Sequence, residues 1–110
     1  MKKNKIVLIL AIVAAGTVSQ ATQYVISQKD KKFDKAEIVV EPGDTVQFYN
    51  QEKDITHNVY SLGPKNSFEL KTQAPGTKSD VVFKEEGETE VECAIHPGMK
   101  FKVKVKAKKK

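Results

Sequence analysis

The most constraining feature of this chain is the alternation of apolar and polar residues in short runs, with no helical period of useful length after the N-terminal segment. The clearest run is 101–107, where Phe, Val, Val and Ala alternate with lysines. Successive side chains of a strand point to opposite faces, so each run predicts a β-strand with one buried face. Further candidate strands cover residues 24–27, 36–40, 45–50, 59–62, 67–70, 78–83 and 88–93.

Turn-forming residues separate these runs. Proline and glycine stand together at Pro42–Gly43, Gly63–Pro64 and Pro75–Gly76, and Gly87 lies between two further candidate strands. Proline fixes φ and glycine accepts positive φ, so both favour tight reversals of the chain. Seven or eight short strands at this spacing predict an all-β fold, a β-sandwich, and 110 residues allow a single domain.

The first 21 residues have the layout of a secretory signal peptide. A short basic start precedes an unbroken apolar run over 6–15, and small residues at Ser19 and Ala21 suggest cleavage after Ala21. A membrane anchor is the alternative, but the run is shorter than the ~20 residues that span a bilayer. We therefore expect an exported, periplasmic or otherwise extracytoplasmic protein without stable membrane insertion, comprising a domain over 22–107 and a basic tail over 108–110.

The charge of the chain gives little support to a nucleic-acid partner. The sequence carries 19 basic and 14 acidic residues, a net charge of +5, but three lysines leave with the signal peptide, so the mature chain carries 16 against 14, or +2. Every basic residue is lysine, whereas arginine is the usual reader of bases and phosphates. The lysine run 106–110 is interpreted as a soluble tail, with a docking patch for an acidic partner as the alternative.

One cysteine cannot form a disulfide within the chain, so it is incidental, an intermolecular link, or a reactive or metal-binding thiol. Cys93, His96 and Met99 lie within seven residues, between a predicted strand and the next. The only other histidine is His57. Two imidazoles, one thiolate and a weak axial thioether form the ligand set of a blue-copper site. The sequence therefore predicts one copper ion held by these four residues.

Other interpretations of the four residues exist. Cys93 alternates inward with its neighbours and could be a core thiol, the histidines could be surface residues, and Met99 could fill the core beside Phe101. A structural zinc site usually has four strong ligands, and only three are present. A thiol-exchange site would favour a Cys-x-x-Cys pair, which the sequence lacks. The combination fits copper best.

At these residues the chain resembles the cupredoxins, the group of plastocyanin, amicyanin and pseudoazurin. Residues 56–59 are similar to the family's His-Asn-Val at the first ligand, 93–99 to its C-terminal ligand loop, and 41–46 to a strand opening. Two residues separate His96 from Met99, as in amicyanins and pseudoazurins, and Pro97 is closer to amicyanin. Small exported proteins of methylamine utilisation look similar, but analogy of fold does not carry over a substrate pathway.

The resemblance implies a Greek-key sandwich and further roles. Asn58 would hydrogen-bond across to the Cys93 loop, the backbone N–H of Ala94 would donate to the Cys93 sulfur, and His96 would be the partly exposed ligand through which electrons leave. The charged stretch 51–55 departs from the family's often apolar rim, so the resemblance does not supply the docking surface of this chain.

These features lead to a soluble electron carrier, a monomer that exchanges single electrons with unidentified redox proteins through Cu(I)/Cu(II). A copper storage or delivery module is the alternative, and a metal-free interaction sandwich is a third. Met-rich or His-rich segments would favour delivery, and the sequence has none. An enzyme is not expected, because four protein ligands leave no open position for a substrate.

Overall fold

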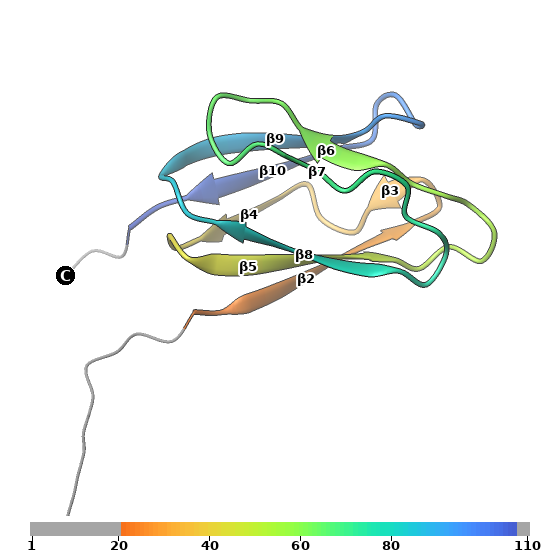
Figure 1. Ribbon diagram of the computed structural model, residues 1–110, viewed down its shortest axis with the longest axis horizontal. Coiled ribbons are helices and arrows are strands. Elements are labelled where there is room, and N and C mark those ends of the chain that lie inside the picture. The colour runs from red at the N-terminus through yellow and green to blue at the C-terminus, as the bar shows by residue number, and fades with distance from the viewer. Residues whose placement is uncertain (1–20, 108–110) are drawn as a thin grey trace, which may run out of the picture.

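The computed structural model describes residues 21–107, which form two β-sheets packed face to face (Figure 1). One sheet has the order β4-β10-β9-β6-β7 and the other β3-β2-β5-β8. The strands are β2 (Gln23–Lys29), β3 (Lys32–Phe33), β4 (Glu37–Val40), β5 (Asp44–Asn50), β6 (Val59–Ser61), β7 (Phe68–Glu69), β8 (Lys78–Phe83), β9 (Gly87–Cys93) and β10 (Lys100–Val105). The predicted signal peptide, apart from Ala21, and the predicted tail 108–110 lie outside the described residues. No helix in 21–107 is long and apolar enough to cross a membrane.

The predicted all-β sandwich is confirmed, with one strand more than expected. The additional strand is β3, which pairs with the end of β2 in a tight hairpin. Its two residues are too few to show alternation, so no local pattern predicts this strand. The last strand also ends earlier than predicted: β10 stops at Val105, and Ala107 is exposed instead of continuing the buried face.

Strands that are distant in sequence meet in both sheets. β10 pairs in parallel with β4 and antiparallel with β9, while β5 pairs in parallel with β2 and antiparallel with β8. Parallel neighbours cannot be joined by a tight turn, so the chain crosses between the two sheets. This crossing brings the segment after β5 and the loop after β9 to the same end of the sandwich.

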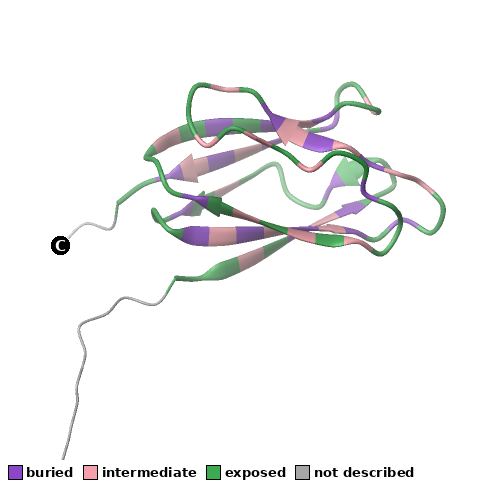
Figure 2. Cartoon of the chain, in the orientation of Figure 1, coloured by how far each residue is buried: buried purple, intermediate pink, exposed green. Residues whose placement is uncertain are grey.

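Alternation along the strands produces the core between the sheets (Figure 2). In β9 the inward residues Thr89, Val91 and Cys93 are all buried, as the sequence predicted for Cys93. Phe48 lies at the centre of the core and is fully buried. Its ring centroid is 5.6 Å from that of Phe68 and 6.3 Å from that of Phe101, so aromatic contacts connect the two sheets.

Replacing Phe48 with alanine should destabilise the metal-free protein by about 3–5 kcal/mol, because a cavity would open between the sheets. Urea unfolding followed by circular dichroism measures this change. Val39, which is half exposed, offers a control. We expect Val39→Ala to change the free energy of unfolding by less than about 1 kcal/mol. Equal losses in the two variants would contradict the assigned core.

Candidate metal centre

His57 is fixed by the segment between β5 and β6. The buried side chain of Asn50 organises this segment: its amide donates to the carbonyls of Ile55 and Gln73, and its oxygen accepts the backbone N–H of Glu52. His57 then exchanges two backbone hydrogen bonds with Gln73, at 3.1 and 2.7 Å. The imidazole is fully buried, which excludes the interpretation of His57 as a surface histidine.

Cys93 ends β9 and lies opposite Val59 of β6. The backbone N–H of Asn58 donates to the Cys93 Sγ at 3.3 Å, and the N–H of Ala94 donates to the Asn58 carbonyl at 2.9 Å. The link between Asn58 and the Cys93 loop is therefore confirmed, but the expected donor to the sulfur was wrong. Ala94 cannot serve because its N–H is directed to the Asn58 carbonyl instead.

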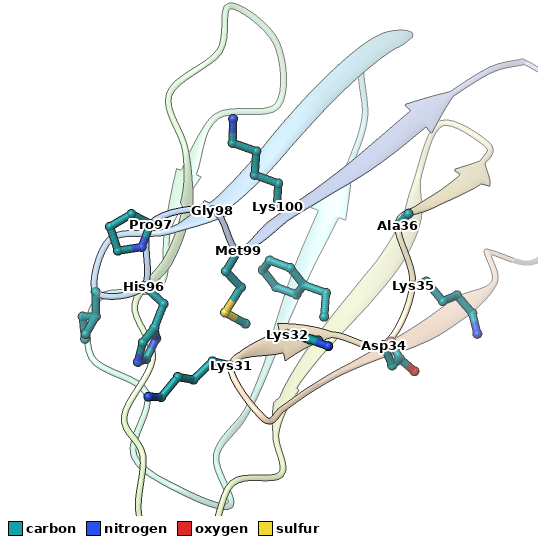
Figure 3. A pocket seen from close by; sticks show the side chains of 12 residues that line it. Lys31, Lys32, Asp34, Lys35, Ala36, His96, Pro97, Gly98, Met99 and Lys100 are labelled. Atoms are coloured by element: carbon teal, nitrogen blue, oxygen red, sulfur yellow. The ribbon is translucent and has the colours of Figure 1, made fainter.

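The loop 94–99 returns the chain into β10. Gly98 has φ of 91°, a backbone conformation that favours glycine, and the Met99 N–H donates to the His96 carbonyl at 3.1 Å. This tight turn leaves His96 half-buried and Met99 buried. The side chains of His96 and Met99 leave the loop on the same side (Figure 3).

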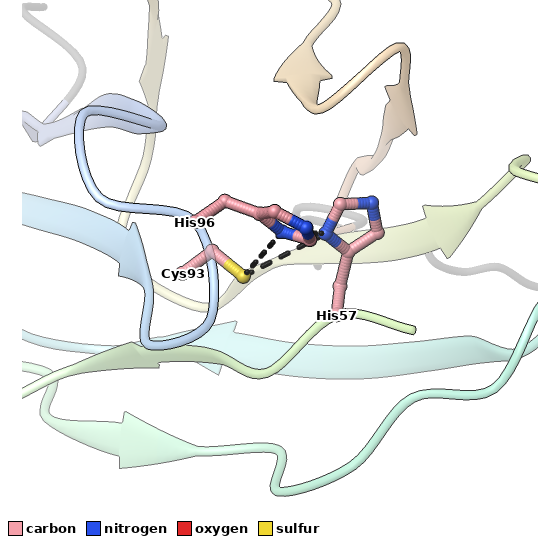
Figure 4. A group of neighbouring side chains, drawn as sticks. All are labelled: His57, Cys93 and His96. Carbon is pink, nitrogen blue, oxygen red and sulfur yellow. Dashed lines mark hydrogen bonds between the residues drawn. The ribbon is translucent and has the colours of Figure 1, made fainter. Parts of the chain in front are cut away.

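Three of the four predicted site residues come together (Figure 4). The Cys93 Sγ is 3.6 Å from the His57 Nδ1 and 3.5 Å from the His96 Nδ1, and the two nitrogens are 3.1 Å apart. A metal ion bound at the usual distances to nitrogen and sulfur, with zinc as reference, requires separations of about 3.3–3.8 Å. The triangle of donor atoms is therefore close to the size that one transition-metal ion needs.

Glu52 determines which nitrogen of His57 faces this triangle. Its Oε2 lies 3.0 Å from the His57 Nε2, and both carboxylate oxygens also accept backbone N–H groups, from Asp30 at 3.1 Å and Lys31 at 2.8 Å. A carboxylate only accepts hydrogen bonds, so the Nε2 carries the proton and the Nδ1 presents its lone pair to Cys93 and His96. Partners of this kind orient metal-binding histidines.

The ionisation of Glu52 and His96 suits metal binding. Burial alone would raise the pKa of Glu52, but the backbone N–H groups and His57 outweigh it and hold that pKa below its usual value. Burial lowers the pKa of His96, and the nearby His57 and Lys31 lower it further against the opposing charge of Glu52. Glu52 is thus ionised and His96 neutral near pH 7, so a ring nitrogen of His96 is available to bind a metal ion.

A comparison with known families agrees with this geometry. Residues 20–106 match the family described as copper binding proteins, plastocyanin/azurin family. The chain belongs to this family. Copper is therefore the metal that the family assigns to the site, and the donor set of two imidazoles and a thiolate suits it.

Individual relatives place the chain near amicyanin. It is 39% identical over 67 residues to the methylamine utilization protein MauL of Methylorubrum extorquens, a match covering 60% of this chain and 58% of that protein. A variant of amicyanin in its reduced Cu(I) form at pH 4 shares the fold with a TM-score of 0.69 and 25% identity, over 81% of this chain and 86% of that one. The Cu-containing nitrite reductase of Thermus scotoductus, at 20% identity and a TM-score of 0.72, shares the fold over 89% of this chain but only 25% of its own.

Glu52 is the residue of the site that the sequence interpretation missed. The sequence places Glu52 in a charged stretch near the rim, whereas the structure buries it against His57. The only sequence feature that links Glu52 to the site is its position five residues before His57. Contacts with the Asp30–Lys31 turn depend on the parallel pairing of β2 with β5, which no local pattern shows.

Glu52→Gln should weaken Cu(II) binding by about 10–100-fold, because one amide cannot hold both backbone N–H groups and the His57 ring as the carboxylate does. Competition against a chelator of known affinity measures the loss. Glu90→Gln, an exposed change on β9, is the matched control and should leave affinity unchanged. Unchanged affinity in Glu52→Gln would contradict the orienting role.

The lowered pKa of Glu52 also predicts an acid dependence of the metal-free protein. Its stabilising contribution is complete above the unfolded value near 4.5 and is lost as the pH falls through the lower folded value. His96 acts in the same direction from 6.5 downwards, and because the charge of Glu52 raises the pKa of His96, the loss from His96 is somewhat larger in Glu52→Gln and opposes part of the difference. Urea unfolding between about pH 6 and pH 3 should therefore show a smaller acid loss in Glu52→Gln than in the wild type. Parallel curves would contradict the assigned ionisation.

Proposed function

We propose that this chain is an exported small blue copper protein that binds one copper through His57, Cys93, His96 and Met99 and transfers single electrons between redox proteins. The observation that carries the proposal is the triangle of the Cys93 sulfur and two imidazole nitrogens, with sides of 3.1–3.6 Å. Met99, buried beside the loop that holds His96, supplies the weak axial sulfur of such a ligand set.

The residues around the triangle suit a centre that moves little when its charge changes. Glu52 orients the ring of His57, and the N–H of Asn58, the residue before β6, donates to the Cys93 sulfur. Bound copper would supply a one-electron Cu(I)/Cu(II) couple. Because hydrogen bonds within the fold hold both supports, the fold determines the positions of the proposed ligands, and little rearrangement would accompany electron transfer.

His96 is the route for electrons into and out of this site. His57 is fully buried and Cys93 is only 3% exposed, whereas His96 is half-buried on a loop. A partner that touches the loop would come closest to the metal through this ring.

The four side chains leave no position for a substrate, so we propose a carrier without catalysis of its own. The signal-like N-terminus supports work outside the cytoplasm, as a monomer between two redox proteins.

The Cu(II)-loaded protein should be intensely blue from charge transfer between the Cys93 thiolate and the metal. Cys93→Ser should remove this absorption almost completely, because the alkoxide or hydroxyl does not replace the thiolate. The measurement is the visible spectrum of protein with one equivalent of Cu(II), with circular dichroism as the check that the variant folds. A colourless wild-type protein that has bound copper would falsify the proposal.

Copper retention and electron exchange of the copper-loaded protein distinguish an electron carrier from a copper delivery module. A carrier should keep its copper when the reduced form is mixed with a competing small thiol, and should exchange electrons rapidly with its oxidised form. A delivery module would release Cu(I) to the thiol. Copper retained on the protein after gel filtration, together with the rate of electron exchange measured by NMR line broadening, gives the answer.

A further inference from the structure

A hollow of about 650 Å³ opens beside the exposed face of His96. One wall is formed by residues 31–36, which run from the turn after β2 to the start of β4. The other wall is formed by the loop 95–100 (Figure 3). Four lysines line it, whereas it has a single carboxylate, Asp34. The lysines are exposed, and they are Lys31, Lys32, Lys35 and Lys100.

The hairpin that carries three of these lysines is held against the candidate metal centre. Asp30 and Lys31 both have positive φ, 55° and 58°, in the tight turn between β2 and β3. Their backbone N–H groups donate to the two carboxylate oxygens of Glu52, which also holds His57. Lys31 therefore lies in a turn that is held relative to the candidate metal ligands, and Lys32 follows it directly in β3.

These lysines are unpaired within the part of the chain that the structure describes. Lys102 and Lys104 of β10 form ion pairs with Glu88 and Glu37, whereas the lysines of the hollow have no carboxylate within ion-pair distance among residues 21–107. Three of the 19 lysines lie in 1–20 and three in 108–110, so this region holds 13 lysines against all 14 carboxylates. The positive field at the hollow is thus local, on a domain that is otherwise slightly acidic.

We propose that the hollow is the docking surface for an acidic redox protein, whose carboxylates contact the four lysines while its own redox centre faces His96. Ile95 and Pro97 add an exposed apolar edge to the same wall. Charged groups of this kind accelerate and orient the encounter, and apolar contact then excludes water. This inference rests on the proposed function, because it needs an electron route through His96.

The first test uses a small anionic oxidant and a cationic one on the copper-loaded, reduced protein. One electron leaves the protein and reduces hexacyanoferrate(III) to hexacyanoferrate(II), followed by stopped flow. At low ionic strength, the variant Lys31→Gln/Lys32→Gln should react about fivefold more slowly with this anionic oxidant. The same variant should react faster with tris(phenanthroline)cobalt(III), which is a cationic oxidant. Added salt should reduce both differences, because screening weakens the local field.

A matched control separates the local field from net charge. Lys84→Gln/Lys106→Gln removes the same charge from exposed positions at the other end of the sandwich, and should change the rate by less than about 1.5-fold. Equal slowing in the two double variants would overturn the proposal, because net charge alone would then explain it.

The second test does not depend on electron transfer. Poly-L-glutamate, added to the isotope-labelled protein, should shift the amide NMR signals of residues 31–36 and 95–100 in the wild type, and much less in Lys31→Gln/Lys32→Gln. Shifts spread evenly over the domain would overturn the docking surface. Localised shifts in a protein that exchanges no electrons would instead keep the anionic docking surface and reject the electron-transfer function.

Discussion

The structure of the site depends on the hydrogen bonds of one buried carboxylate. Glu52 accepts a hydrogen bond from the Nε2–H of His57 and two more from the backbone N–H groups of Asp30 and Lys31 in the β2–β3 turn. Without it, the His57 ring could present either nitrogen, and the hairpin would lose its fixed position beside the ligand loop. A buried carboxylate is unfavourable without partners, so three hydrogen bonds are needed to keep it ionised there. The same contacts then connect the interior of the site to its surface.

A second constraint is the junction of β6 with β9. The Asn58 N–H donates to the Cys93 sulfur and the Asn58 carbonyl accepts from the Ala94 N–H, so one bond to a side chain and one backbone–backbone bond join the two segments that carry candidate ligands. Sheet pairing thus holds the His57 segment and the Cys93 loop together. This pairing helps to place the three donor atoms within 3.1–3.6 Å of one another.

The surface around His96 combines features with different physical roles. The half-buried imidazole gives access to the site, Ile95 and Pro97 provide apolar contact, and lysines from the hairpin and the loop create a positive field. Long-range charge determines how often and in which orientation a partner arrives, while apolar contact acts only at short range. Because these features occupy one end of the sandwich, a partner attracted by the lysines would meet the proposed electron route directly.

The sequence by itself determined the sandwich and the chemistry of the site. Alternation reveals buried faces because the period of a strand is a local property, and the rarity of cysteine, histidine and methionine singled out four residues. The tertiary structure decided what lies across the strands: the two-residue strand β3, the donor to the Cys93 sulfur, and the burial of Glu52 against His57. It also placed the lysines of the hairpin beside His96. These contacts arise from parallel strand pairing and from the packing of the two sheets. They join residues far apart in sequence, so no local sequence pattern predicts them.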